Sequence, residues 1–80
     1  MIVKVKLFAV LKEALGDSVE IDLPQPATVS NLLEQFAEQY PQFRSALPSL
    51  NVAVDYTYSR GDHVIDPGQE VAIFPPVSGG

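Results

Sequence analysis

The sequence predicts an α+β fold in which one main helix packs across one face of a small mixed sheet. Three observations predict it. Two segments near the start of the chain alternate apolar and polar residues as half-buried strands do, one later segment repeats apolar residues at helical spacing, and several short strand-like segments follow. The chain has 80 residues, of which 46% are apolar, so it can bury the core of a single small domain.

The first two strands are predicted at residues 2–9 and 18–23. In the first, the odd-numbered residues form the core face and include Ala9, whereas Phe8 points to the opposite face. Residues 10–15 between the strands are expected to form a short helix that ends at Gly16.

The main helix is predicted at residues 29–40, where apolar residues recur at helical intervals. Thr28 stands at the N-cap position, and Pro41 ends the helix. Residues 42–50 are ambiguous and could form a short helical turn. Strands are expected at 51–54, 56–59, 64–65 and 70–74, with turns at 60–62 and 66–68.

One face of the predicted sheet lacks a helix to cover it. In the last strand Val71 and Ile73 form the core set, so Phe74 points to the open face, as Phe8 does from the first strand. If those two strands are neighbours, Phe8, Ala72 and Phe74 form an exposed apolar patch of the kind that marks docking surfaces. Alternatively, a loop or residues 42–50 could cover it.

The composition argues against several functional classes. The chain has no cysteine and a single histidine, His63, so no metal site is expected. A net charge of −5 argues against a nucleic-acid partner; it suits a basic protein surface, although scattered acids also serve solubility. Without a signal peptide or long apolar run, we expect a cytoplasmic protein with no membrane contact.

The last residues of the sequence carry its most distinctive chemistry. Residues 75–80 read Pro-Pro-Val-Ser-Gly-Gly, and we expect the chain to end in a free carboxylate on Gly80. The prolines favour an extended tail, which at about 3.3 Å per residue would reach roughly 20 Å, while the glycines could thread a narrow slot. That carboxylate could attack the α-phosphate of ATP in a partner and then accept sulfur. A frayed end or an expression scar is the alternative.

No side-chain constellation indicates a self-contained enzyme. The serines have no histidine at a recognisable spacing, and no glycine-rich phosphate loop is present. Asp62 and His63 are adjacent and are expected to face apart in a solvated loop. The sequence Arg60-Gly61-Asp62 is expected to be a plain turn and not an adhesion motif.

The segment from Glu70 to Gly80 resembles the C-terminal signature of the MoaD family, the small subunit of molybdopterin synthase. Residues 6–16 resemble that family's first strand and short helix, and residues 51–55 its middle strand. The resemblance therefore covers nearly the whole chain. It implies a β-grasp, ubiquitin-like fold with the first and last strands central and parallel, built as a domain at residues 1–74 and an extended tail at 75–80.

The resemblance also implies a function, in which the chain is not catalytic alone but is the sulfur-carrier subunit of a sulfurtransferase. An adenylating activator similar to MoeB would use ATP on Gly80, and a persulfide donor would convert Gly80 to a thiocarboxylate. The chain itself would hold no cofactor. The tail would enter a large subunit similar to MoaE and give sulfur to cyclic pyranopterin monophosphate in molybdenum cofactor biosynthesis. The residues expected to bind in that site are Pro75, Pro76, Val77, Ser78 and Gly79, and those expected at the interface are Phe8 and Phe74.

Two departures from the family pattern are Asp55, where asparagine is frequent, and Gln69, where aspartate is frequent. Three other functions remain open. The chain could carry sulfur for the thiamine thiazole or for a tRNA base, it could be a ubiquitin-like modifier joined to lysines, or it could be an interaction module with an inert tail.

Overall fold

A computed structural model describes residues 1–76 of the chain. Its helices and strands in chain order are β1 (Ile2–Leu7), α1 (Ala9–Leu15), β2 (Ser18–Asp22), β3 (Ala27–Thr28), α2 (Val29–Gln39), the 3₁₀ helix η1 (Pro41–Ser49), β4 (Asn51–Val54), β5 (Thr57–Ser59), β6 (Val64–Ile65) and β7 (Val71–Phe74).

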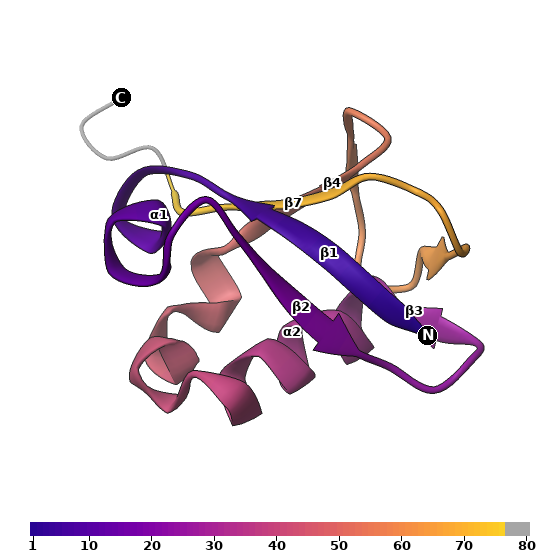
Figure 1. Cartoon of the computed structure of the whole chain (residues 1–80), viewed down its shortest axis with the longest axis horizontal. Coiled ribbons are helices and arrows are strands. Elements are labelled where there is room, and N and C mark those ends of the chain that lie inside the picture. Colours follow the sequence, from indigo (N-terminus) through magenta and orange to yellow (C-terminus); the bar gives the residue numbers. More distant parts are fainter. Residues whose placement is uncertain (77–80) are drawn as a thin grey trace.

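Five of these strands form one mixed sheet in the order β2-β1-β7-β4-β5. The first strand β1 runs parallel to the last strand β7, whereas every other neighbouring pair is antiparallel. Figure 1 shows α2 and η1 on one side of this sheet, with β1 and β7 crossing its middle. The expected β-grasp arrangement, with the first and last strands central and parallel, is confirmed.

The core lies between the sheet and α2, as the alternation predicts. Side chains of β1, β2 and β7 alternate between this core and the other face of the sheet, and α2 contributes one apolar stripe. The largest side chains with almost no exposure are Phe36, Leu7, Leu11, Ile21, Leu32, Ile65 and Ile73.

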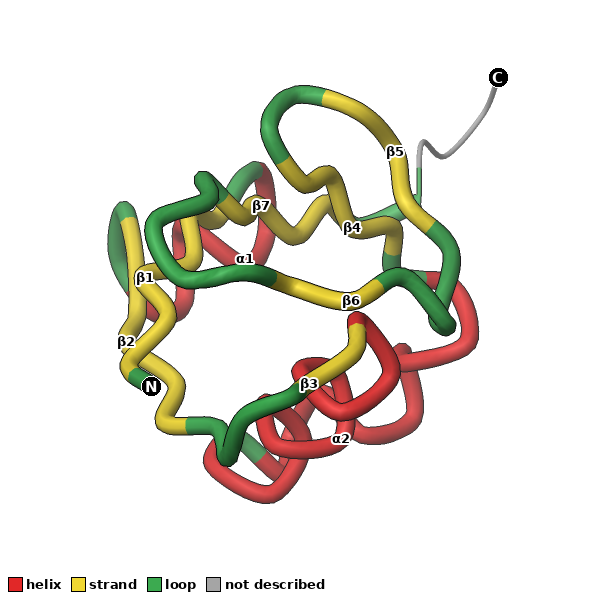
Figure 2. Tube along the Cα trace, turned by 90° about the vertical axis from the view of Figure 1, so that its right-hand side faces the viewer, coloured by secondary structure: helices red, strands yellow, loops and turns green. Residues whose placement is uncertain are grey.

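Thr28 caps α2, as predicted. Its hydroxyl accepts a hydrogen bond from the Asn31 N–H at 3.2 Å, and the Asn31 side chain accepts one from the Thr28 N–H at 2.9 Å. The first turn of α2 is also satisfied from the loop before β6, because the carbonyls of Gly61 and His63 accept from the N–H groups of Ser30 and Val29. Figure 2 shows that loop meeting α2 beside the small β3–β6 pair.

The prediction that Ala9 continues the core face of the first strand is wrong. Strand β1 ends at Leu7, Phe8 has extended backbone angles as the N-cap of α1, and Ala9 already begins the helix. Ala9 has a φ of 54°, so the chain turns sharply there and the side chain is exposed. The short helix otherwise ends at Gly16 as expected, where the Gly16 N–H donates to the Lys12 carbonyl at 2.8 Å.

The segment 42–50, whose structure the sequence left ambiguous, lies almost entirely within the 3₁₀ helix η1. Three of its residues, Phe43, Ala46 and Leu47, pack against the core from the α2 side. Phe43 also stacks on Phe36 with a ring separation of 5.9 Å. This segment therefore extends the helical layer and does not cover the open face of the sheet.

Strand β7 ends at Phe74, so Pro75 and Pro76 follow the last hydrogen-bonded residue. The division into a domain at 1–74 and a tail at 75–80 stays a prediction, because only two residues of that tail are described.

Candidate functional site

The open face of the sheet carries the candidate site, and its middle is a row of directly paired residues. Lys6 of β1 pairs with Ala72 of β7, Ala72 pairs with Ala53 of β4, and Ala53 pairs with Tyr58 of β5. The two alanines in the centre are small, whereas the side chains around them are long or aromatic. The face is therefore hollowed along its middle.

Phe8 and Phe74 form one wall of this hollow. Their rings are stacked with centroids 4.5 Å apart and planes 13° apart, and Phe8 remains 39% exposed. Phe8 reaches this position from the junction of β1 and α1, and Phe74 from the end of β7. The prediction that both rings point away from the core and lie together is confirmed, and their role at an interface stays a prediction.

A further part of the wall comes from two tyrosines that the sequence did not single out. Tyr58 meets Phe74 edge-on at 5.8 Å and is 72% exposed, and Tyr56 is 84% exposed. The alternation of Tyr58 with Thr57 and Ser59 was the signal for its orientation, but its proximity to Phe74 depends on the pairing of β4 with both neighbours. Sequence periodicity alone does not give that pairing.

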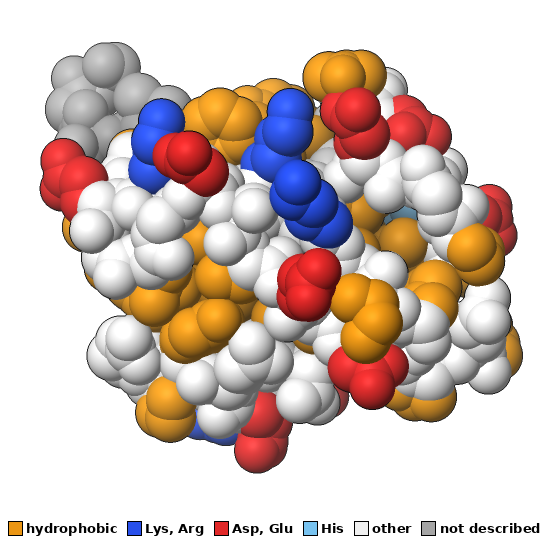
Figure 3. All heavy atoms as spheres, in the orientation of Figure 1, with side chains coloured by type: hydrophobic (Ala, Val, Ile, Leu, Met, Phe, Trp, Pro, Cys, Tyr) orange, Lys and Arg blue, Asp and Glu red, His pale blue; other side chains and the backbone are white. Residues whose placement is uncertain are grey.

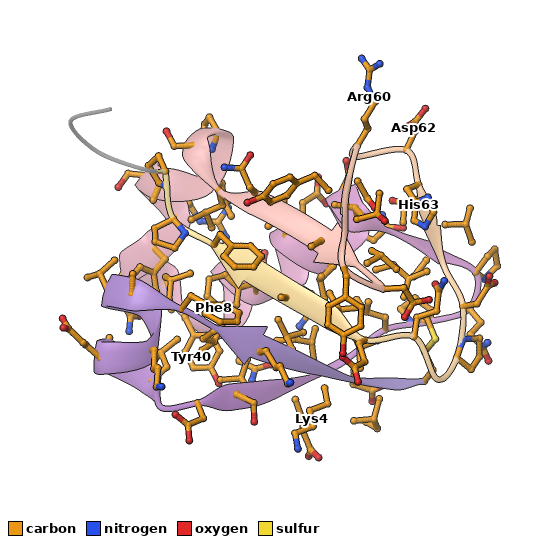
Figure 4. All side chains as sticks on the ribbon, turned by 90° about the horizontal axis from the view of Figure 1, so that it is seen from above. Lys4, Phe8, Tyr40, Arg60, Asp62 and His63 are labelled. Atoms are coloured by element: carbon orange, nitrogen blue, oxygen red, sulfur yellow. The ribbon has the colours of Figure 1, made fainter. Side chains whose placement is uncertain are left out.

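These walls enclose one groove of about 280 Å³, whose lining residues are Lys6, Phe8, Ala53, Tyr56, Tyr58, Glu70, Val71, Ala72 and Phe74. In the space-filling view of Figure 3, hydrophobic side chains gather among lysines along the upper side of the molecule. Figure 4 looks down on the same face and shows Phe8 lying over one end of the sheet. An apolar groove with a few charged groups at its rim suits a protein partner.

The two departures from the family pattern are in contact with each other. Asp55 Oδ2 accepts a hydrogen bond from Gln69 Nε2 at 3.1 Å, and Asp55 Oδ1 accepts one from the Glu70 N–H at 3.0 Å. Gln69 Oε1 in turn accepts from the Asp66 N–H at 2.7 Å. The Asp55 carboxylate therefore ties the turn between β4 and β5 to the residues that lead into β7.

Asp55 and Tyr56 form a two-residue turn between β4 and β5, and both have positive φ, 50° and 69°. Positive φ at both central positions is typical of a type I′ turn, where asparagine and glycine are favoured. A hydrogen bond with the Glu70 carboxylate, followed by the negative charge of Glu70, raises the pKa of the Tyr56 hydroxyl. Tyr56 and Glu70 thus lie together at the end of the groove formed by the turn.

The predicted tail residues lie mostly outside the described part of the chain. Pro75 is half-buried and Pro76 is exposed. Val77, Ser78, Gly79 and Gly80, including the residue expected to carry sulfur, are outside the described residues. Their assignment therefore stays a prediction.

The loop around Arg60, Asp62 and His63 lies apart from this site, as Figure 4 shows. The His63 N–H donates to the Arg60 carbonyl at 3.0 Å, which confirms a local turn. Within residues 1–76, no group of three or more histidine, cysteine or acidic residues could hold a metal ion. None of the helices in that range is long and apolar enough to cross a membrane.

Comparisons with known proteins agree over nearly the whole chain. The model of the ThiS family matches residues 5–80. The molybdopterin synthase sulfur carrier subunit of Dictyostelium discoideum is 44% identical, with 96% of this chain and 94% of that protein covered. The subunit of the same name from Escherichia coli K12 is 40% identical, with 98% and 99% covered.

Solved structures agree on the β-grasp fold. The small archaeal modifier protein 1 of Haloferax volcanii has a TM-score of 0.81 and 28% identity, with 95% of this chain and 98% of that chain covered. A chain from the complex of subunits 1 and 2 of the molybdopterin-converting factor of Helicobacter pylori has a TM-score of 0.68 at 20% identity, and both chains are fully covered. This second likeness concerns the fold alone.

Proposed function

The chain belongs to the ThiS family, and from this premise we propose that it is the sulfur-carrier subunit of a molybdopterin synthase. The observation that carries the proposal is the match over nearly all of the chain to sulfur carrier subunits of that enzyme. The family match runs through Gly80, so it includes the residues assigned to sulfur transfer.

In this function the reactive group is the carboxylate of Gly80. It attacks the α-phosphate of ATP in an adenylating partner and forms an acyl-adenylate, with pyrophosphate as the leaving group. The outer sulfur of a persulfide then attacks the acyl carbon, forming a C–S bond as AMP leaves. A thiol next attacks the inner sulfur of the former persulfide and breaks its S–S bond, so that a disulfide forms and the thiocarboxylate is released. The thiocarboxylate gives its sulfur to cyclic pyranopterin monophosphate in the large subunit.

The described residues supply the docking part of this function. The stacked Phe8 and Phe74 lie on the open face, and Phe74 is the last residue of β7 before the tail. A partner that binds this face would therefore meet the tail at its root. The similarity to proteins named as sulfur carrier subunits of molybdopterin synthase supports the other subunit of that enzyme as the partner.

Intact mass spectrometry tests the terminal chemistry. After co-expression with the adenylating activator and a persulfide donor, replacement of one oxygen by sulfur on Gly80 should add about 16 Da. A matched control carries one alanine after Gly80, which leaves residues 1–76 unchanged and removes the glycine carboxylate. The control should show neither the added mass nor sulfur transfer; the same mass gain in both proteins would place the sulfur elsewhere and refute the proposal.

A second candidate function is that of a ubiquitin-like protein modifier, which the likeness to the small archaeal modifier protein 1 favours. A modifier uses the same activated Gly80 but passes it to lysine amines of target proteins. Immunoblots of cells that express the chain distinguish the two functions. Abundant slow-migrating conjugates that disappear when Gly79 and Gly80 are deleted would favour the modifier, and their absence would favour the pure carrier.

A further inference from the structure

We infer that Tyr56 and Glu70 determine partner specificity at the far end of the open-face groove, where they bind an arginine side chain of the large subunit. This inference rests on the proposed function and names a contact within it. It extends the docking surface beyond the phenylalanine pair to the turn between β4 and β5.

Continuity of the groove is the first argument. The same hollow that begins at Phe8 and Phe74 continues over Ala72 and ends at Tyr56 and Glu70. A partner seated on the phenylalanines therefore covers this end as well if it fills the groove. Hot spots of protein interfaces are enriched in tyrosine that lies in such grooves.

The conformation of Tyr56 is the second argument, because it does not serve the fold. Its φ of 69° is in the left-handed region, which a bulky side chain rarely adopts and which asparagine or glycine would occupy with less strain. At 84% exposure the ring contributes little to the core. A strained, exposed aromatic residue is best explained by a contact that the isolated chain lacks.

Charge complementarity identifies the occupant. The chain carries a net charge of −5. Two charged side chains line the groove, the Glu70 carboxylate at the Tyr56 end and the ammonium group of Lys6. Tyr56 and Glu70 line the same groove, and the N–H of Asp55, the neighbour of Tyr56, donates to the Glu70 carbonyl at 2.8 Å, so a carboxylate lies near an exposed aromatic ring. A guanidinium group can stack on that ring and donate two hydrogen bonds to that carboxylate, which a lysine ammonium cannot match.

Calorimetric titration of the full chain with the large subunit tests the inference. Glu70→Gln should weaken binding about fivefold to tenfold in dilute salt, and the loss should shrink to about twofold in 1 M salt, where the Debye length is about 3 Å. The matched control is Glu34→Gln, which removes the same charge from an exposed position on α2. Its affinity should stay within about twofold of the wild type.

Substitution of Tyr56 separates binding from folding. Tyr56→Asn suits the left-handed conformation, so the melting temperature should hold or rise by up to about 4 °C, while affinity falls about fivefold. Tyr56→Phe keeps the ring and should lose less affinity than Tyr56→Asn. A residue with a merely structural role would instead lose melting temperature and affinity together, and that result would overturn the inference.

The remaining outcomes separate this inference from the proposed function. If Phe74→Asp abolishes binding while the Tyr56 and Glu70 variants bind within twofold of the wild type, the inference is wrong and the proposed function stands. If Glu34→Gln weakens binding as much as Glu70→Gln, the effect is one of overall charge and the inference is again wrong. If the wild-type chain does not bind the large subunit at all, both fail.

Discussion

The contact between Asp55 and Gln69 leads to a prediction about two substitutions that should harm stability singly and restore it together. Asp55→Asn leaves a donor–donor conflict whichever way the new amide turns, since its Nδ2 faces either Gln69 Nε2 or the Glu70 N–H. Gln69 cannot resolve the conflict by turning, because its Oε1 accepts from the Asp66 N–H at 2.7 Å. Gln69→Asp alone brings a second carboxylate against Asp55.

The magnitude follows from the groups involved. Asp55→Asn removes one hydrogen bond, whereas Gln69→Asp removes the bond that Gln69 donates to Asp55 and the bond that it accepts from the Asp66 N–H. At these exposed sites each single change should cost about 1–2 kcal/mol of the free energy of unfolding. For a domain of this size, each kcal/mol lowers the melting temperature by about 4–8 °C. In the double variant the new asparagine at position 55 donates to the new aspartate at position 69 and still accepts from the Glu70 N–H. Its stability should lie within about 0.5 kcal/mol of the wild type.

Thermal denaturation of the four proteins, followed by circular dichroism in one buffer, measures the coupling. We expect the two substitutions to be coupled by at least about 1 kcal/mol, in the direction in which the second rescues the first. The backbone gives a fair comparison, since asparagine tolerates the positive φ of position 55 as well as aspartate does. A coupling below about 0.5 kcal/mol would mean that the side-chain bond contributes nothing in solution, and the reasoning would be refuted.

Three further predictions concern the core, the docking face and the groove. Phe36→Ala should lower the free energy of unfolding by about 3–5 kcal/mol, because the ring is fully buried against Tyr40 and η1; an unchanged melting curve would contradict the packing of α2. Phe74→Asp should weaken binding to the large subunit by calorimetry while the monomer stays folded, and equal affinity would exclude Phe74 from the interface. In an NMR titration, Tyr56 should ionise above its ordinary pKa of about 10, and Glu70→Gln should lower that pKa. Any stabilisation from the contact between Tyr56 and Glu70 is present below about pH 10 and is lost as the pH rises through the raised pKa. A Tyr56 titration that Glu70→Gln does not move would contradict the contact.

Most of the fold could be predicted because its signals are local. Period-two alternation in β1 and β2, the apolar stripe of α2 and the Thr28 cap each depend on residues within a few positions of one another. Ala9 was misassigned for the same reason. Alternation assumes that the strand continues, whereas a φ of 54° at Ala9 turns the chain into α1 and changes the side that the residue faces.

The site could be predicted only for residues whose side of the sheet follows from the alternation within a single strand. Phe8 and Phe74 could be placed on one face from alternation alone, and the parallel β1–β7 pair then brought them into contact. Tyr58 required the register of β5 on β4 and of β4 on β7, which is a long-range property. Tyr56 required in addition the positive φ values of a tight turn, for which the sequence Asp55-Tyr56 carries no strong signal.

Strand β7 links the stability of this domain to its ability to dock. It is hydrogen-bonded on both sides, to β1 and to β4, so it is among the segments least able to open locally. Its alternate residues serve the two faces, with Val71 and Ile73 in the core and Ala72 and Phe74 along the groove. A slip of one residue in its register would expose the core pair and bury Phe74 at once. The packing that holds Ile73 in the core therefore also fixes the position of the stacked phenylalanines beside the start of the tail. A partner that binds this face contacts side chains whose positions are determined by the packing of the core.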